Sequence, residues 1–330
     1  MTVSRPVLIG GLTLVALLAG LASLMVGSAS IAPERLLAAL AGSDDRIASV
    51  ILFELRLPRA ILGLAVGAML GLSGAALQGY LRNPLAEPAV LGASNAAALG
   101  AVIALYFGLA AIHPAVLPLL AILTGLGALG LLFLLAGKAE SPLTLILAGI
   151  AVATMAGAGI SLALNLAPNP FAAIEIMTWL MGSLEDRSFS HVWVALPCIA
   201  VGGALLLWDG RALDALTLGE DGAAALGVDL AAVRLRLMLG VAIGVGGAVA
   251  VTGAIGFIGL IVPHLVRPLT DRSPSAILLP SALAGAALLT LADLGVRLIP
   301  ASSELKLGVV TAFLGVPVFL AYLMRERRLW

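Results

Sequence analysis

Residues 60–80 read AILGLAVGAMLGLSGAALQGY and contain no charged side chain. A helix of about 20 apolar residues can cross the hydrocarbon core of a bilayer, where every backbone polar group must find a partner within the protein. Gly63, Gly67 and Gly71 recur every four residues, a spacing at which small residues let two helix backbones approach closely. The stretch predicts a membrane-spanning helix whose glycine face packs inside the subunit or against a second subunit.

The composition extends this interpretation to the whole chain of 330 residues. Hydrophobic residues make up 61%, charged residues 11%, and the mean hydropathy is +1.14, whereas soluble domains contain about 45–50% apolar and about 25% charged residues. A water-soluble protein is therefore excluded. The 18 basic and 18 acidic residues cancel, so no overall field would attract nucleic acid. Cys198 is the only cysteine, which excludes intrachain disulfides and thiolate metal sites.

Long apolar stretches predict about ten membrane helices, which makes the fold class an all-α integral membrane protein. The predicted spans are approximately 7–27, 60–80, 88–109, 115–136, 142–165, 191–208, 234–254, 257–269, 278–298 and 308–324. The eighth is short for a full crossing. The first resembles a signal peptide in position, but its apolar run is longer than the roughly 7–15 residues of such a segment, so we expect it to be retained as a helix.

The distribution of basic residues predicts the topology. An even number of spans places both termini on one side, and Arg325, Arg327 and Arg328 in the tail indicate that this side is the cytoplasm. Eleven Lys and Arg residues then lie inside and seven outside, a modest bias. The seven outside are Arg35, Arg46, Arg56, Arg59, Arg187, Arg297 and Lys306. These outward basic residues need a reason of their own.

Two segments outside the predicted spans interrupt what is otherwise a single transmembrane domain over residues 1–330. Residues 168–190 carry Trp179 and then Glu185-Asp186-Arg187, and we expect a short periplasmic helix and loop. Residues 208–233 form the longest polar stretch, in which the apolar spacing predicts two short cytoplasmic helices broken at Gly219 and Gly227.

Several motifs exclude other functions. Residues 125–130 (GLGALG) match the dinucleotide-binding pattern, but they lie within an apolar helix without a preceding strand or a following acidic residue. No Walker loop occurs, so the chain itself binds no ATP and any ATP is used by a partner subunit. His113, His191 and His264 are too scattered for a metal site. Neither a catalytic cluster nor a bound cofactor is expected.

Charges near the predicted outer ends are the remaining candidates for function. Asp293 and Arg297 are four residues apart on one helix face, which suits either an ion pair or a functional intramembrane charge. Arg56 and Arg59 flank Pro58 at the outer start of the second span. A guanidinium fork suits carboxylates on a partner surface, although solvated or headgroup-bound arginines remain the alternative.

Blocks along nearly the whole chain resemble one family, the FecCD-type permeases of bacterial ABC importers for siderophore-bound iron, haem and vitamin B12. These blocks are 55–59 (LRLPR), 71–74 (GLSG) with Gln78, 82–88 (RNPLAEP), 179–183 (WLMGS), 226–228 (LGV), 256–264 (GFIGLIVPH) with Arg267, and 315–319 (GVPVF). The sequence departs from the family pattern at Ala96, at Lys306 and at Ser273-Pro274-Ser275. These departures lie in loops or span ends and put only local details in doubt.

The resemblance implies a type II ABC importer permease of ten helices in the bacterial inner membrane. It implies a second permease subunit, with a homodimer favoured over a heterodimer, together with two ABC ATPase subunits, a periplasmic substrate-binding protein and contact with membrane lipids. Arg56, Arg59 and Arg297 match positions that face acidic residues of the binding protein in the family's vitamin B12 importer. This would supply the reason for the outward arginines.

The same resemblance implies two further sets of site residues. The polar stretch matches the loop that seats in the ATPase, and its expected coupling residues are Leu218, Gly219, Glu220, Asp221, Ala225, Leu226 and Gly227. Small, weakly polar positions on the fifth span resemble a translocation pathway, and these are Thr154, Met155, Ser161 and Asn165.

The function predicted from the sequence is ATP-driven import of an iron–siderophore complex, which is the commonest cargo of the family. Vitamin B12 and haem are alternatives, because all three cargoes share these permease motifs. A self-powered secondary transporter is a more distant alternative, since it requires acidic residues at mid-membrane and only Asp293 approaches that depth.

Overall fold

The computed structural model describes residues 4–27, 31–42, 44–113, 115–136, 142–301 and 303–326, and every regular element within these ranges is a helix. The long helices are α1 (Arg5–Met25), α4 (Leu57–Leu81), α7 (Val116–Ala136), α8 (Pro142–Asn165), α10 (Phe189–Trp208), α13 (Leu230–Thr252), α15 (Pro274–Leu298) and α16 (Leu307–Glu326). The shorter α-helices are α2 (Pro33–Leu40), α3 (Arg46–Ser49), α5 (Ala93–Tyr106), α6 (Leu109–Ile112), α9 (Pro170–Leu180), α11 (Gly210–Leu216), α12 (Glu220–Ala225) and α14 (Ile258–Val266). A π-helical segment, η1 (Val50–Arg56), precedes α4, and a 3₁₀ turn, η2 (Arg267–Leu269), follows α14.

The predicted membrane architecture is confirmed, with a count that is only approximately ten. Seven helical stretches are long and apolar enough to cross a bilayer, and four shorter apolar helices accompany them: Ala93–Tyr106, Pro170–Leu180, Ile258–Leu269 and Leu307–Leu320. Each of the ten predicted spans contains a helix. Lys138, Arg327 and Arg328, which the topology prediction counts, lie outside the described residues.

The third predicted span, 88–109, is too long at its start. The helix α5 begins only at Ala93, and residues 82–92 form a series of turns. Pro84 and Pro88 have no N–H to donate, and Gly92 adopts a φ of +77°, which L side chains avoid. Local bonds such as that from the Leu85 N–H to the Asn83 side chain, 2.9 Å long, pair the backbone groups instead. The apolar last part of this loop, residues 88–92, was therefore wrongly predicted as the start of a helix.

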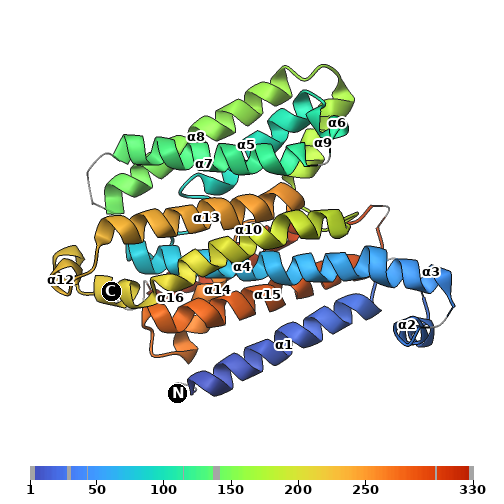
Figure 1. The fold of residues 1–330 in the computed structure, drawn as a ribbon, viewed down its shortest axis with the longest axis horizontal. Coiled ribbons are helices and arrows are strands. Elements are labelled where there is room, and N and C mark those ends of the chain that lie inside the picture. Colours follow the sequence, from blue (N-terminus) through green and yellow to red (C-terminus); the bar gives the residue numbers. More distant parts are fainter. Residues whose placement is uncertain are drawn as a thin grey trace.

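The helix α4 lies at the centre of the molecule, where α15, α14, α10 and α13 pack around it (Figure 1). A side chain at Gly67 would overlap the backbone carbonyl of Gly285 in α15, and one at Gly74 would overlap that of Gly259 in α14. A side chain at Gly202 of α10 would likewise overlap the backbone of Gly240 and Gly244 in α13. The glycine faces therefore pack inside the subunit, where the closeness of the backbones maximises dispersion contacts.

The bundle has two ends that differ in character. Figure 1 shows α12 and the labels of both chain ends on one side, with α3, α6 and α9 on the other. We call the first side the α12 end and the second the Arg59 end, because Arg59 is in the first turn of α4 that points there. Termini on the same side agree with an even number of crossings.

Candidate functional site

An ion-pair cluster occupies the Arg59 end. The Arg59 guanidinium donates from Nε to both oxygens of Asp293 at 3.1 Å and from Nη2 to Asp293 Oδ1 at 2.8 Å. On its other side it donates to Glu304, from Nη2 to Oε2 at 2.7 Å and from Nη1 to Oε1 at 3.2 Å. The side chains of Arg59 and Asp293 are only 11% and 2% exposed. Two carboxylates thus bind one guanidinium, in the bidentate geometry that gives the strongest charge-assisted hydrogen bonds.

Arg297 and Arg56 hold the end of α1. Arg297 Nη1 donates to the carbonyls of Ser23 and Val26 at 2.9 Å, and its Nη2 donates to the Ser23 hydroxyl and, at 2.6 Å, to Asp293. Arg56 Nη1 donates to the carbonyls of Leu24 and Met25 at 3.0 and 2.8 Å. The last carbonyls of a helix lack helical donors and carry partial negative charge, and α1 has no basic residue in its own last turn. Two arginines from α15 and η1 therefore cap it.

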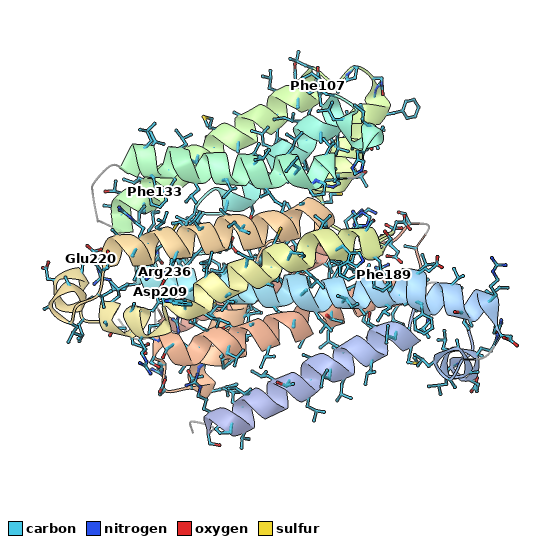
Figure 2. The ribbon with its side chains drawn as sticks, in the orientation of Figure 1. Phe107, Phe133, Phe189, Asp209, Glu220 and Arg236 are labelled. Carbon is cyan, nitrogen blue, oxygen red and sulfur yellow. The ribbon has the colours of Figure 1, made fainter. Side chains whose placement is uncertain are left out.

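A cavity of about 150 Å³ opens between these groups, and we call it the arginine pocket. Four arginines and three acidic residues line it: Arg56, Arg59, Arg187, Arg297, Glu185, Asp186 and Glu304. Arg187 and the two acidic residues before it belong to the connection from α9 to α10. Phe189, two residues further on, marks this region in Figure 2. Lys306 binds Glu185 at 2.7 Å beside the pocket.

The structure brings the three predicted docking arginines together but gives them internal partners. Arg56 and Arg297 are only 5% and 8% exposed, and Arg59 is bound to Asp293 and Glu304. The pair predicted from the spacing of Asp293 and Arg297 is present. Docking of a partner on these arginines stays a prediction. The fourth arginine of the pocket, Arg187, was not predicted as a site residue, because nothing in its local sequence distinguishes it from a solvated arginine.

The polar stretch at the α12 end folds as predicted into two short helices, α11 and α12. The chain turns at Gly219 and Gly227 with φ values of +93° and +84°, which glycine adopts without strain. Leu213, Leu216 and Ala223 point into the core, whereas Leu218 and Leu226 are 70% and 65% exposed. Of the other predicted coupling residues, Asp221, Ala225 and Gly227 are exposed, and Gly219 and Glu220 are half-buried.

Polar contacts fix this segment on the bundle. Arg236 of α13 donates to both oxygens of Asp209 at 2.7 and 2.8 Å, and Figure 2 shows the two side chains pointing toward each other, with Glu220 farther out. The Asp214 side chain accepts from the Ser275 N–H at 2.8 Å. Glu220 and Asp221 stand in the first turn of α12, where acidic groups suit the helix dipole. The segment of α11 and α12 is thus held against the bundle, and its Leu218 and Leu226 side chains are exposed.

The four predicted pathway residues lie on α8, and all four are exposed in the subunit. Thr154, Ser161 and Asn165 share a helix face because seven and four residues separate them. The Thr154 hydroxyl is turned back to the Ile150 carbonyl at 2.7 Å, so the face is less polar than its sequence suggests. This exposure suits a pathway or a subunit contact, and the role of the residues stays a prediction.

A buried amide joins α4 to the proline-containing helix α14. Pro263 has no N–H, so the carbonyl of Gly259, four residues earlier, loses its helical donor. Gln78, only 3% exposed, directs its Nε2 to the carbonyls of Gly259 and Leu260 at 3.4 and 3.3 Å, and its Oε1 accepts from Arg267 at 3.0 Å. His264 Nδ1 also donates to the Leu260 carbonyl, at 2.7 Å.

Known proteins resemble the chain over almost its full length. A model of the FecCD transport family matches residues 14–325. The vitamin B12 import system permease protein BtuC of Vibrio vulnificus is 40% identical over 311 residues, which cover 92% of this chain and 89% of the relative. The cobalamin import system permease protein BtuC of Halobacterium salinarum is 42% identical over 287 residues, covering 85% and 74%.

Two further matches come from an uncharacterised relative and from a solved structure. The ABC transporter permease protein YvrB of Bacillus subtilis is 40% identical over 292 residues, covering 87% of this chain and 82% of the relative. The solved structure is of an ABC transporter provisionally assigned to the metal-chelate type, in an inward-facing conformation. It superposes with a TM-score of 0.87 at 32% identity over 97% of this chain and 99% of that one. The chain therefore belongs to the FecCD transport family and is a membrane permease of the ABC importer type.

Proposed function

We propose that this permease carries a bulky metal chelate of the cobalamin type through the membrane, driven by ATP that a separate subunit hydrolyses. The observation that carries the proposal is the division of the two ends: a charged pocket at the Arg59 end and exposed leucines on a fixed base at the α12 end. A binding protein delivers the chelate to the first, and an ATPase subunit seats on the second. Nucleotide-dependent movement of the ATPase then biases two packings of the bundle.

The proposed assembly contains two copies of the permease, two ATPase subunits and one binding protein in a bacterial inner membrane. The α12 end faces the cytoplasm together with both termini, as the basic residues favour. The exposed face of α8 lines the pathway or the contact between the copies. No bond of the cargo is broken by this chain, so its task is to open alternately to the two sides.

The cargo is proposed from the named relatives. Permeases for vitamin B12 or cobalamin from Vibrio and Halobacterium are 40–42% identical to this chain, which favours a corrinoid over the iron–siderophore complex preferred from the sequence. An iron–siderophore complex is the second candidate, because the solved neighbour is assigned to the metal-chelate type.

The function can be tested in proteoliposomes that hold the permease and its ATPase. The binding protein is enclosed on the face of the Arg59 end, and ATP is added on the face of the α12 end. We expect ATP-dependent movement of labelled cyanocobalamin away from the binding-protein face and none with the two additions exchanged. Movement of a ferric siderophore instead would correct the cargo, and movement of neither would count against the proposed function.

The exposed leucines of the α12 end give a separate test. Replacing Leu218 and Leu226 together with glutamate should lower ATP-driven uptake about tenfold or more, since the loss of an apolar anchor from an interface costs about 2 kcal/mol. The variant should still fold, because both side chains are exposed. Leu37→Glu, at a leucine that is 57% exposed on α2 at the opposite end, is the matched control and should leave ATPase binding unchanged. Normal uptake by the double variant would remove the coupling role from this segment.

A further inference from the structure

We propose that the Arg187 guanidinium binds a carboxylate side chain of the docking binding protein. Arg187 is then the cation of the arginine pocket whose ion pair is formed only with the partner. This assignment rests on the proposed function and names a contact residue within it. Three observations support it: Arg187 has no acceptor among the described residues, the pocket carries an excess of positive charge, and the backbone around the residue is anchored on both sides.

Arg187 lacks the partners that other arginines of the pocket possess. Arg59 is held by two carboxylates, and Arg297 by Asp293 and the end of α1. Arg187 makes no hydrogen bond or ion pair to any part of the chain that the structure describes, and its Nε is buried without an acceptor. Its neighbour Glu185 is already bound to Lys306 at 2.7 Å. A buried donor left unpaired costs about 1–3 kcal/mol, and more if charged, which a docking carboxylate would relieve.

The charges around the pocket do not balance. The pocket and its bound partners bring together five basic and four acidic side chains, which are Arg56, Arg59, Arg187, Arg297 and Lys306 against Glu185, Asp186, Asp293 and Glu304. Burial lowers the pKa of the Arg187 guanidinium because desolvation disfavours its charged form, and Arg59 nearby lowers it further, while Asp186 and Glu185 act in the opposite direction. One added negative charge would neutralise the pocket.

The backbone on either side of Arg187 is fixed. Leu184, fully buried, anchors the segment on one side, and the Ser183 N–H donates to the Thr252 carbonyl at 2.7 Å. On the other side Ser188 and His191 form a capping box at the start of α10. Between these anchors Asp186 takes a left-handed φ of +57°, which turns the chain at the pocket. Little backbone conformational entropy would then be lost when a partner binds.

The size and charge of the arginine pocket indicate which kind of group it can bind. A cavity of about 150 Å³ is smaller than the roughly 300–1,000 Å³ of sites that enclose a small-molecule ligand, so it takes a side chain and not the transported chelate. A guanidinium offers parallel N–H groups that match the two oxygens of a carboxylate. The partner therefore presents Asp or Glu at this point of its surface.

The test measures binding of the cobalamin-loaded binding protein to the permease–ATPase complex in lipid nanodiscs. Arg187→Gln should weaken binding about tenfold and Arg187→Glu about a hundredfold, since removing one partner of a buried charge pair has effects of this size. Arg187→Lys keeps the positive charge but loses the paired N–H groups, so its affinity should lie between those of the unmodified protein and Arg187→Gln. Arg46→Glu, at an exposed arginine of α3 that lies outside the pocket, is the matched control and should bind as the unmodified protein does.

A measurement on the unmodified complex covers the case in which the variants fail to fold. An arginine-specific dicarbonyl reagent should modify Arg187 in the free permease, and the docked binding protein should protect it, as read by peptide mass spectrometry. Unchanged affinity of Arg187→Glu, or equal modification with and without the partner, would overturn the assignment of Arg187 alone. If the unmodified permease binds no binding protein, the proposed function fails and this assignment fails with it.

Discussion

Replacing Asp293 with asparagine is expected to lower the free energy of unfolding by about 3–5 kcal/mol, the usual effect of removing one member of a buried ion pair. Asp293 is 1% exposed and binds both Arg59 and Arg297. Without its charge, two guanidinium groups remain in a desolvated site with Glu304 as the acidic partner of Arg59. The measurement is the thermal midpoint of the purified permease in detergent, together with the yield of protein inserted in the membrane.

Two comparisons make the Asp293 result specific. Asp45→Asn removes the charge from an exposed ion pair with Arg35 and retains a side chain that caps a helix equally well, so its midpoint should stay close to that of the unmodified protein. The double variant Asp293→Asn, Arg297→Met should recover part of the loss, because it removes one of the buried unpaired charges. If Asp293→Asn has the same thermal midpoint as Asp45→Asn, the ion-pair cluster does not stabilise the fold.

Gly74→Ala is expected to lower the stability by about 2–3 kcal/mol, as overpacking of a close core does, although alanine favours a helix over glycine by about 1 kcal/mol. The added methyl group would overlap the Gly259 carbonyl oxygen, so α4 and α14 would have to separate. The thermal midpoint in detergent is again the measurement. We also expect lost transport, because Gln78 reaches α14 only while the two helices are close.

Gly127→Ala is the matched control for Gly74. Gly127 also lies within a long helix, α7, but a side chain there would meet nothing within 4 Å. The substitution should therefore raise the stability by up to about 1 kcal/mol through helix propensity alone. An equal response of the two glycines would show that the α4–α14 contact is not as close as the structure has it.

The helices were predictable from the sequence because their signal is local. Apolar length alone located all ten predicted spans, and the polar break with Gly219 and Gly227 located the two short helices at the α12 end. The start of α5 was not predictable in this way, since residues 88–92 are apolar and yet non-helical. Pro84, Pro88 and Gly92 prevent a helix there through their backbone geometry and missing N–H groups, and the hydropathy of a sequence does not contain this information.

The ion-pair cluster could be predicted only where its members are close in sequence. Asp293 and Arg297 are separated by four residues, and that spacing indicated their pair. Arg59 and Asp293 are separated by 234 residues, so the folded packing of α4 on α15 creates their contact. For the same reason, an arginine with a partner, such as Arg59, and one without, such as Arg187, look alike in the sequence.

The amide of Gln78 makes two distant positions depend on each other during evolution. While Pro263 withholds an N–H from the Gly259 carbonyl, replacing Gln78 with leucine would leave that carbonyl buried without a donor. If leucine replaced Pro263 first, the backbone of α14 could supply the donor itself, and Gln78 would be needed only as the acceptor for Arg267. The order in which these two substitutions occur therefore decides whether a lineage passes through a destabilised intermediate.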